Sequence, residues 1–239
     1  MSTFVLVHGG GHGGWCYNKI NPLLRAARHL VYSPSLTGCG DRKHVLSPSV
    51  GLETHITDIV NLLEYEDLTQ IILVGHSYGG MVITGVADRV PGRIRELVYL
   101  DAAHPRDGES LRMVAPQQIE PTYQGVRIVD GVELVMWPMP GMAHFFGITD
   151  PADVAWTDAK LTPHPWKCFA EPLRLTDPEG MRRVRRTNIN CTQSLRNSSG
   201  AARARQLDGE RNLEIDTGHD LMITEPEAVA KMLLDIAAS

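Results

Sequence analysis

Cysteine is scarce in this sequence, and no two cysteines form a CxxC pair. The four that occur, Cys16, Cys39, Cys168 and Cys191, are spread widely along the chain. Disulfide frameworks and zinc sites depend on recurring, closely spaced cysteines. We therefore expect reduced thiols, no metal site and a cytoplasmic location.

Long apolar runs and blocks of charge are also missing. No apolar run approaches the ~20 residues that a membrane-spanning helix needs. No charged region and cleavage site flank the apolar residues 3–7, so we expect no signal peptide. The formal net charge is -5, and the one basic run is RRVRR at residues 182–186. A solvated helix face explains that run better than a phosphate-binding patch, so we expect neither a membrane nor a nucleic-acid partner.

Apolar segments suited to strands alternate with amphipathic segments suited to helices. The 239 residues are enough for one large domain with a substantial core. Alternation at this spacing predicts an α/β fold, a mostly parallel sheet with helices on both faces. We expect strands at residues 4–7, 30–33, 71–74, 96–100, 187–191 and 213–216, and helices at residues 18–27, 52–64, 81–89 and 225–238.

The alternation fails between residues 103 and 181. This stretch holds most of the prolines, three of the four tryptophans and several methionines. Its aromatic content argues against a disordered linker and for packed structure. We therefore predict a core formed by residues 1–102 and 182–239 and an apolar cap, or lid, at residues 103–181 that lines a pocket. A second small core is the simpler alternative, and it is compatible with a cap.

Ser77 lies in the sequence Gly75-His76-Ser77-Tyr78-Gly79, between an apolar segment and a helical pattern. In this strand–turn–helix setting G-x-S-x-G marks a nucleophilic serine. The turn is sharp, so the residues two positions before and after the serine must be very small. The serine hydroxyl then lies at a helix N-terminus, where partial positive charge favours a developing oxyanion.

A serine nucleophile needs a base and an oxyanion hole. His219 follows the last predicted strand and precedes the last helix, which makes it our candidate base. We expect the backbone N–H groups of Tyr78 and Gly10 to form the oxyanion hole. His8 and His12 are better suited to supporting the glycine-rich loop. That loop lacks the helix-opening spacing and the acidic residue of a dinucleotide site, so we expect no cofactor.

The combination of motifs resembles the α/β-hydrolase superfamily. It is most similar to the branch that holds plant methylsalicylate esterases, hydroxynitrile lyases and small bacterial esterases, including pyrethroid-hydrolase-like enzymes. The segments that carry the resemblance are residues 4–15, 75–80, 98–102 and 217–220. The resemblance implies an α/β-hydrolase fold with an inserted cap and a catalytic triad. It does not specify a substrate.

One position departs from the pattern of that branch. Ser194 stands where the resemblance implies the triad carboxylate, and a hydroxyl cannot stabilise an imidazolium as a carboxylate does. Asp101 ends the strand after the nucleophile helix, where the haloalkane dehalogenases carry their acid. We therefore predict Asp101 as the partner of His219, with a loop-capping role as its alternative. The weaker candidates are the distant Asp208, and Asp216 and Asp220, which are too near His219 in sequence.

These residues predict a serine esterase that cleaves a small to medium hydrophobic carboxylic ester through an acyl-enzyme. The replacement at Ser194 keeps a non-catalytic, ligand-binding hydrolase fold as an alternative. A hydroxynitrile lyase is less well supported, because Gly9 and Asp220 replace the threonine and lysine that the resemblance implies for it. Dehalogenases use an aspartate nucleophile and are excluded by Ser77. The sequence leaves the oligomeric state open, with a homodimer as one option.

Overall fold

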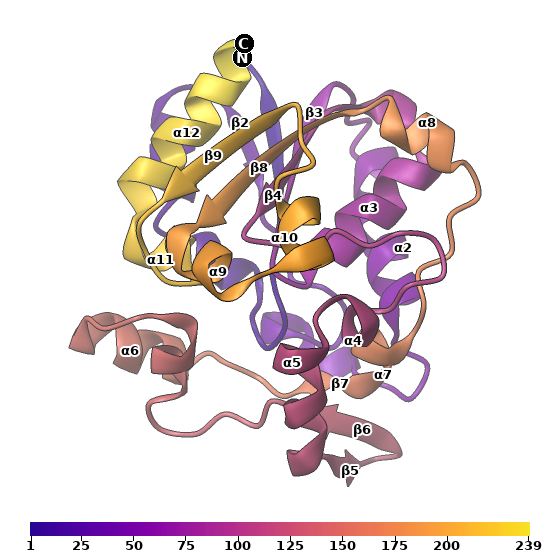
Figure 1. Cartoon of the computed structure of the whole chain (residues 1–239), viewed down its shortest axis with the longest axis vertical. Coiled ribbons are helices and arrows are strands. Elements are labelled where there is room, and N and C mark those ends of the chain that lie inside the picture. Colours follow the sequence, from indigo (N-terminus) through magenta and orange to yellow (C-terminus); the bar gives the residue numbers. More distant parts are fainter.

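A six-stranded, fully parallel sheet forms the centre of the computed structural model, which describes residues 1–239 (Figure 1). The strand order is β2-β1-β3-β4-β8-β9, and every neighbouring pair is parallel. The strands are β1 (Thr3–Val7), β2 (Leu30–Tyr32), β3 (Ile71–His76), β4 (Ile94–Leu100), β8 (Arg185–Cys191) and β9 (Arg211–Ile215). All six expected strands are present, so the predicted α/β fold is confirmed.

Side chains of the strands alternate between two apolar layers. Phe4 and Leu6 of β1 face one layer, whereas Val5 and Val7 face the other. The first layer is covered by α1 (Asn21–Ala26) and α12 (Pro226–Ala238), and the second by α2 (Leu52–Tyr65) and α3 (Gly79–Arg89). Both faces of the sheet are therefore covered by helices, as is typical of a parallel sheet.

The segment at residues 103–181, for which no strand was predicted, contains a second sheet. Its strands are β5 (Arg127–Val129), β6 (Val132–Val135) and β7 (His164–Pro165), and they pair antiparallel. Asp130 and Gly131 join β5 to β6 with φ angles of 49° and 78°. Two successive positive φ angles match a type I′ hairpin turn, for which Asp-Gly is a favoured pair. The strands are too short to leave a clear period-two pattern.

Short helices complete the segment at residues 103–181, and they pack onto the main core. Trp166 and Phe169 of α7 (Trp166–Ala170) share one apolar cluster with Val5 and Val7 of the central sheet. The other helices of the segment are α4 (Leu111–Val114), α5 (Pro116–Ile119), η4 (Glu120–Gly125), η5 (Met142–Phe146), α6 (Pro151–Asp158) and α8 (Pro178–Arg182). The segment therefore has no fully separate core.

The remaining helices are short. They are η1 (Gly14–Tyr17), η2 (Gly40–Val45), η3 (Pro91–Arg93), α9 (Thr192–Asn197), α10 (Gly200–Gln206) and α11 (Leu221–Thr224). None of the helices has both the length and the apolar character needed to cross a membrane.

Candidate active site

Ser77 occupies a strained turn between β3 and α3. Its φ angle is 53°, in the left-handed region that non-glycine residues seldom adopt. A Cβ atom on Gly75 would lie 2.7 Å from the carbonyl oxygen of Gly79, and one on Gly79 would lie 2.7 Å from that of Val7. Backbone atoms therefore leave no room for side chains at either position. This geometry turns the Ser77 side chain out of the sheet and into a cavity.

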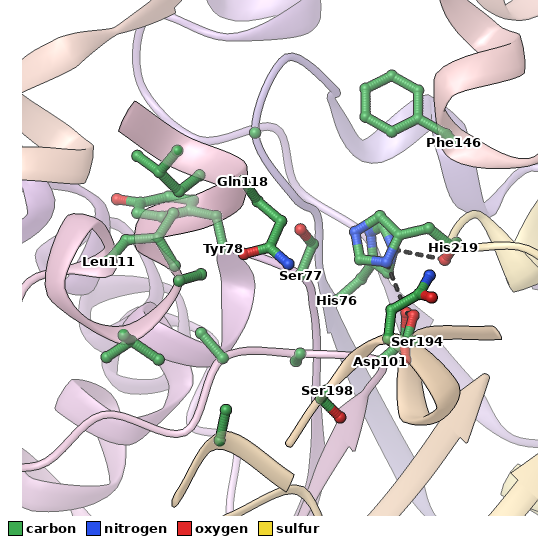
Figure 2. A pocket seen from close by; sticks show the side chains of 18 of the residues that line it. His76, Ser77, Tyr78, Asp101, Leu111, Gln118, Phe146, Ser194, Ser198 and His219 are labelled. Atoms are coloured by element: carbon green, nitrogen blue, oxygen red, sulfur yellow. Dashed lines mark hydrogen bonds and ion pairs between the residues drawn. The ribbon is translucent and has the colours of Figure 1, made fainter. Parts of the chain in front are cut away.

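His219 lies after β9 on the wall of the same cavity, and its ring reaches Asp101 at the end of β4 (Figure 2). The distance from His219 Nδ1 to Asp101 Oδ2 is 2.6 Å. Since a carboxylate only accepts, Nδ1 carries the proton and Nε2 is left free to act as a base. No hydrogen bond joins Nε2 to the Ser77 hydroxyl, and such bonds are often long without substrate.

Asp101 is buried and held by three donors. Ser194 Oγ donates to Oδ2 at 2.6 Å, and the backbone N–H of Cys191 donates to Oδ1 at 3.0 Å. Burial alone would raise the pKa of Asp101, but the hydrogen bonds from His219, Ser194 and Cys191 outweigh it and lower the pKa. Ser194 therefore contacts the carboxylate and not the imidazole, and Asp101 stays ionised.

The charge of Asp101 acts in turn on His219. Burial by itself lowers the pKa of His219, but the hydrogen bond and the charge of Asp101 raise it above the ordinary value of 6.5. His76 differs sharply, because burial lowers its pKa to about 3. His76 is thus neutral at working pH, and its Nε2–H donates to the backbone oxygen of His219 at 3.0 Å. His76 occupies a variable position of G-x-S-x-G, so its role could not be predicted from the motif.

The two expected oxyanion donors face the cavity. Gly10 and Tyr78 both line it, and neither backbone N–H donates to a protein acceptor. A Cβ atom on Gly10 would lie 2.7 Å from the Phe169 ring. His8 Nδ1 donates to the Gly9 carbonyl oxygen at 2.8 Å and so fixes the orientation of the peptide that carries the Gly10 N–H. Two N–H groups are therefore free for a substrate oxygen.

The cavity has a volume of about 440 Å³. Its apolar lining comes largely from the segment at residues 103–181 and includes Leu111, Val114, Ile119, Met136, Phe146 and Phe169. Gln118 of α5 also lines the cavity, and Figure 2 shows its amide turned toward the side that holds Ser77. The space suits a compact, mainly apolar ligand with a polar group near Ser77.

Comparison with known proteins decides the family. The sequence model of the Alpha/beta hydrolase family matches residues 4–232, which is nearly the whole chain. This chain belongs to the Alpha/beta hydrolase family. The resemblance expected from the motifs is therefore confirmed.

Two curated relatives and one solved structure align over almost their full lengths. A carbendazim hydrolyzing esterase from Nocardioides sp. is 38% identical over 245 residues, covering 98% of both chains. Salicylic acid-binding protein 2 from Nicotiana tabacum is 28% identical, covering 98% of this chain and 96% of its own. An extracellular alpha/beta-hydrolase from a Paenibacillus species has a TM-score of 0.82 at 24% identity and covers 98% of both chains.

A buried ion pair that sequence reasoning missed joins two loops of this hydrolase. His12 Nε2 lies 2.9 Å from Asp220 Oδ2, and both side chains are almost fully buried. Burial opposes ionisation of both groups, but their mutual attraction raises the pKa of His12 and lowers that of Asp220. The pair joins the Gly10 loop to the His219 loop. Its two residues are 208 positions apart in the sequence, so no local motif could predict their contact.

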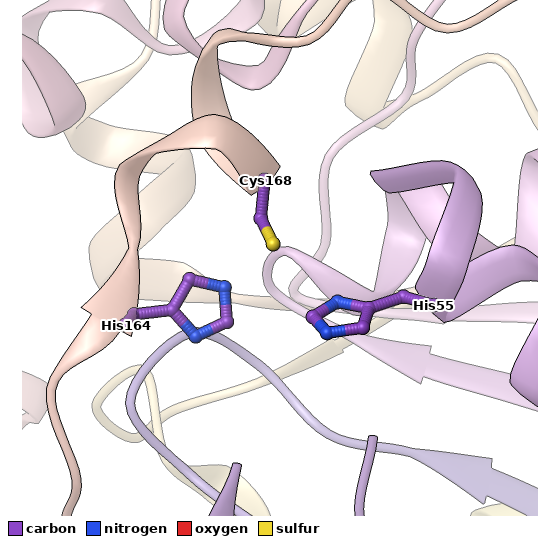
Figure 3. A group of neighbouring side chains, drawn as sticks. All are labelled: His55, His164 and Cys168. Carbon is purple, nitrogen blue, oxygen red and sulfur yellow. The ribbon is translucent and has the colours of Figure 1, made fainter. Parts of the chain in front are cut away.

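One cluster offers metal-ligating atoms (Figure 3). His55, His164 and Cys168 are buried, and one potential ligand atom from each lies within 4.8 Å of the others. Both ring nitrogens of His55 are already engaged, with the Tyr78 hydroxyl and with the carbonyl oxygen of Thr37. A metal ion would have to break the hydrogen bond between His55 and Tyr78. The donor set therefore fits a hydrogen-bonded network better than a metal centre.

Proposed function

We propose that this chain is a serine esterase that cleaves a small to medium hydrophobic carboxylic ester through an acyl-enzyme. The observation that supports this most directly is the 2.6 Å contact of His219 with Asp101, in the cavity that also holds Ser77. The 38% identity to a relative named a carbendazim hydrolyzing esterase supports the same chemistry.

The proposed reaction has two halves. Ser77 Oγ attacks the ester carbonyl while His219 Nε2 takes its proton, and Asp101 stabilises the imidazolium that forms. The N–H groups of Gly10 and Tyr78 hold the oxyanion. His219 then protonates the leaving alcohol, which gives the acyl-enzyme. Water attacks this intermediate with His219 again as base, and the acid leaves.

The same site leaves less support for the other two functions. The argument for a non-catalytic binding role is that Ser194 replaces the usual triad carboxylate. Asp101 supplies a carboxylate to His219 from the neighbouring strand end. Hydroxynitrile lyase chemistry would need positive charge beside His219, whereas Asp220 there is paired with His12.

We propose further that residues 103–181 act as the substrate-binding cap of a core formed by residues 1–102 and 182–239. Support comes from the apolar cavity lining that this segment supplies. A cytoplasmic location also remains a proposal; all four cysteines are free and buried, which suits a reducing compartment.

The acyl-enzyme can be observed directly. With p-nitrophenyl butyrate we expect a rapid, stoichiometric burst of p-nitrophenol followed by slower turnover. A fluorophosphonate probe should modify the peptide that contains Ser77, as read by mass spectrometry. A protein that is folded but shows neither burst nor labelling would rule out the proposed function.

The pH dependence should follow His219. His219 is a base only when neutral, so kcat/KM should fall as the pH drops through its raised pKa. Because Asp101 causes the rise, the acid limb in Asp101→Asn should move to lower pH. Measuring kcat/KM for p-nitrophenyl butyrate across this range tests the sign. A limb that stays in place would mean that another group controls it.

A further inference from the structure

Several buried polar side chains with no part in the proposed reaction surround the side chain of Tyr78. His55 Nδ1 lies 2.9 Å from the Tyr78 hydroxyl, and the buried Cys168 sulfur lies within 4.8 Å of a ring nitrogen of His55. The His164 ring packs edge-on against the Tyr78 ring, with 5.1 Å between centroids. Burying several polar side chains costs stability unless they form hydrogen bonds with one another. A functional role would account for this cluster.

The directions of these hydrogen bonds are fixed by their partners. The Thr37 carbonyl oxygen can only accept, so His55 Nε2 carries a proton and His55 Nδ1 accepts from the Tyr78 hydroxyl. The N–H of Gly11 can only donate, so His164 Nδ1 accepts and His164 Nε2 carries the proton. Burial lowers the pKa of both histidines and raises that of Tyr78, so all three stay neutral.

His164 Nε2 is the one ring nitrogen of this cluster without a hydrogen-bond partner. Figure 3 shows it turned toward Cys168 and His55. The cluster thus offers the Tyr78 hydroxyl an acceptor in His55 Nδ1, with the unpaired N–H of His164 beside it. Such an arrangement resists rotation of the Tyr78 side chain, because each alternative orientation would strand a buried polar atom.

The cluster contacts both halves of the oxyanion hole. Tyr78 supplies one N–H, and its ring and hydroxyl lie inside the cluster. Gly11, whose N–H donates to His164, directly follows Gly10, which supplies the other. The two donors come from loops far apart in sequence. Their separation in space must nevertheless be constant if both are to bind one oxygen atom.

We propose that His55, His164 and Cys168 are positioning residues that hold the two oxyanion donors at a fixed separation, through Tyr78 and Gly11. The proposal rests on the proposed esterase function. A donor that is displaced binds the carbonyl oxygen of the substrate almost as well as before, but it binds the transition-state oxyanion less well. The cluster should therefore affect kcat and leave KM nearly unchanged.

Tyr78→Phe tests the proposal, because it removes the central hydroxyl and keeps the ring. We expect kcat for p-nitrophenyl butyrate to fall about tenfold, a fraction of the hundredfold or more caused by deleting an oxyanion donor. KM should change little. Affinity for a trifluoromethyl ketone, which forms an oxyanion on the serine, should fall by the same factor as kcat. Tyr78→Phe combined with Cys168→Ala should cost less than the sum of the two single losses.

Tyr99→Phe is the matched control. Tyr99 is also buried, and its hydroxyl also makes one hydrogen bond at 2.8 Å, to Thr84. It should lose similar thermal stability but keep its kcat and ketone affinity. Cys168→Ser retains a donor and should stay close to the unmodified protein.

Three results would overturn the proposal. They are a Tyr78→Phe protein that matches Tyr99→Phe in kcat, a loss that appears mainly in KM, and stoichiometric zinc in the purified protein that Cys168→Ala removes. An unmodified protein that neither turns over esters nor binds the ketone would instead show that the esterase function itself is wrong. The two failures are thus distinguishable.

Discussion

Asp101→Asn should lower kcat for ester hydrolysis by roughly a thousandfold to ten-thousandfold, as for other triad-acid replacements. The asparagine amide can keep the contact with His219 Nδ1, but it can donate to that nitrogen. His219 would then carry its proton on Nε2, where it cannot accept the proton of Ser77. Steady-state rates with p-nitrophenyl butyrate, measured on protein checked for a normal melting temperature, give the ratio.

Ser194→Ala is the control for this prediction. Ser194 Oγ donates to the same carboxylate oxygen that His219 contacts. Its loss should slightly destabilise the ionised acid while leaving the histidine tautomer intact, so we expect a loss of only a few-fold. Near-normal activity in Asp101→Asn would defeat the assignment. Equal losses in the two variants would mean that both side chains act only by packing.

His219→Ala should cause the largest loss of all, on the order of a millionfold in kcat, as for the serine or histidine of a comparable triad. Without a base the Ser77 hydroxyl stays protonated through the attack. The burst of p-nitrophenol should disappear, and the turnover rate should fall to the rate of spontaneous ester hydrolysis.

His144→Ala provides the comparison for His219. His144 also lines the cavity, and its Nδ1 is bonded to the carbonyl oxygen of Ile148. We expect its kcat to remain within a few-fold of the unmodified protein. Substantial turnover in His219→Ala, or an equal loss in His144→Ala, would show that the base has been misassigned.

The nucleophile region was predictable because its constraints are local. Gly75, Ser77 and Gly79 lie within five consecutive residues, and a side chain on Gly75 would clash with the backbone of Gly79 itself. Strands β1 and β3 were predictable for a related reason, since each holds a run of four apolar residues that are all buried. Their order in the sheet follows from tertiary packing.

The sequence could suggest Asp101 as the triad carboxylate but could not establish its contact with His219, because the two residues are 118 positions apart. Two neighbouring strand ends must come together before that pair can be seen. The cluster of His55, His164 and Cys168 is more difficult to predict from sequence. No spacing rule links a residue of α2 to residues of β7 and α7. At residues 103–181, Asp130-Gly131 was a usable hairpin signal, but the strands on either side are too short to show a period-two pattern.

The buried pair of His12 and Asp220 limits which related enzymes this one can evolve into. A lysine at position 220, which the resemblance implies for the lyase branch, would remove the carboxylate that keeps His12 charged and place an unpaired buried ammonium group beside it. The single substitution would therefore destabilise the fold before any new chemistry could be selected. We therefore expect positions 12 and 220 to be epistatic, so that a lysine at position 220 is better tolerated together with a replacement at position 12.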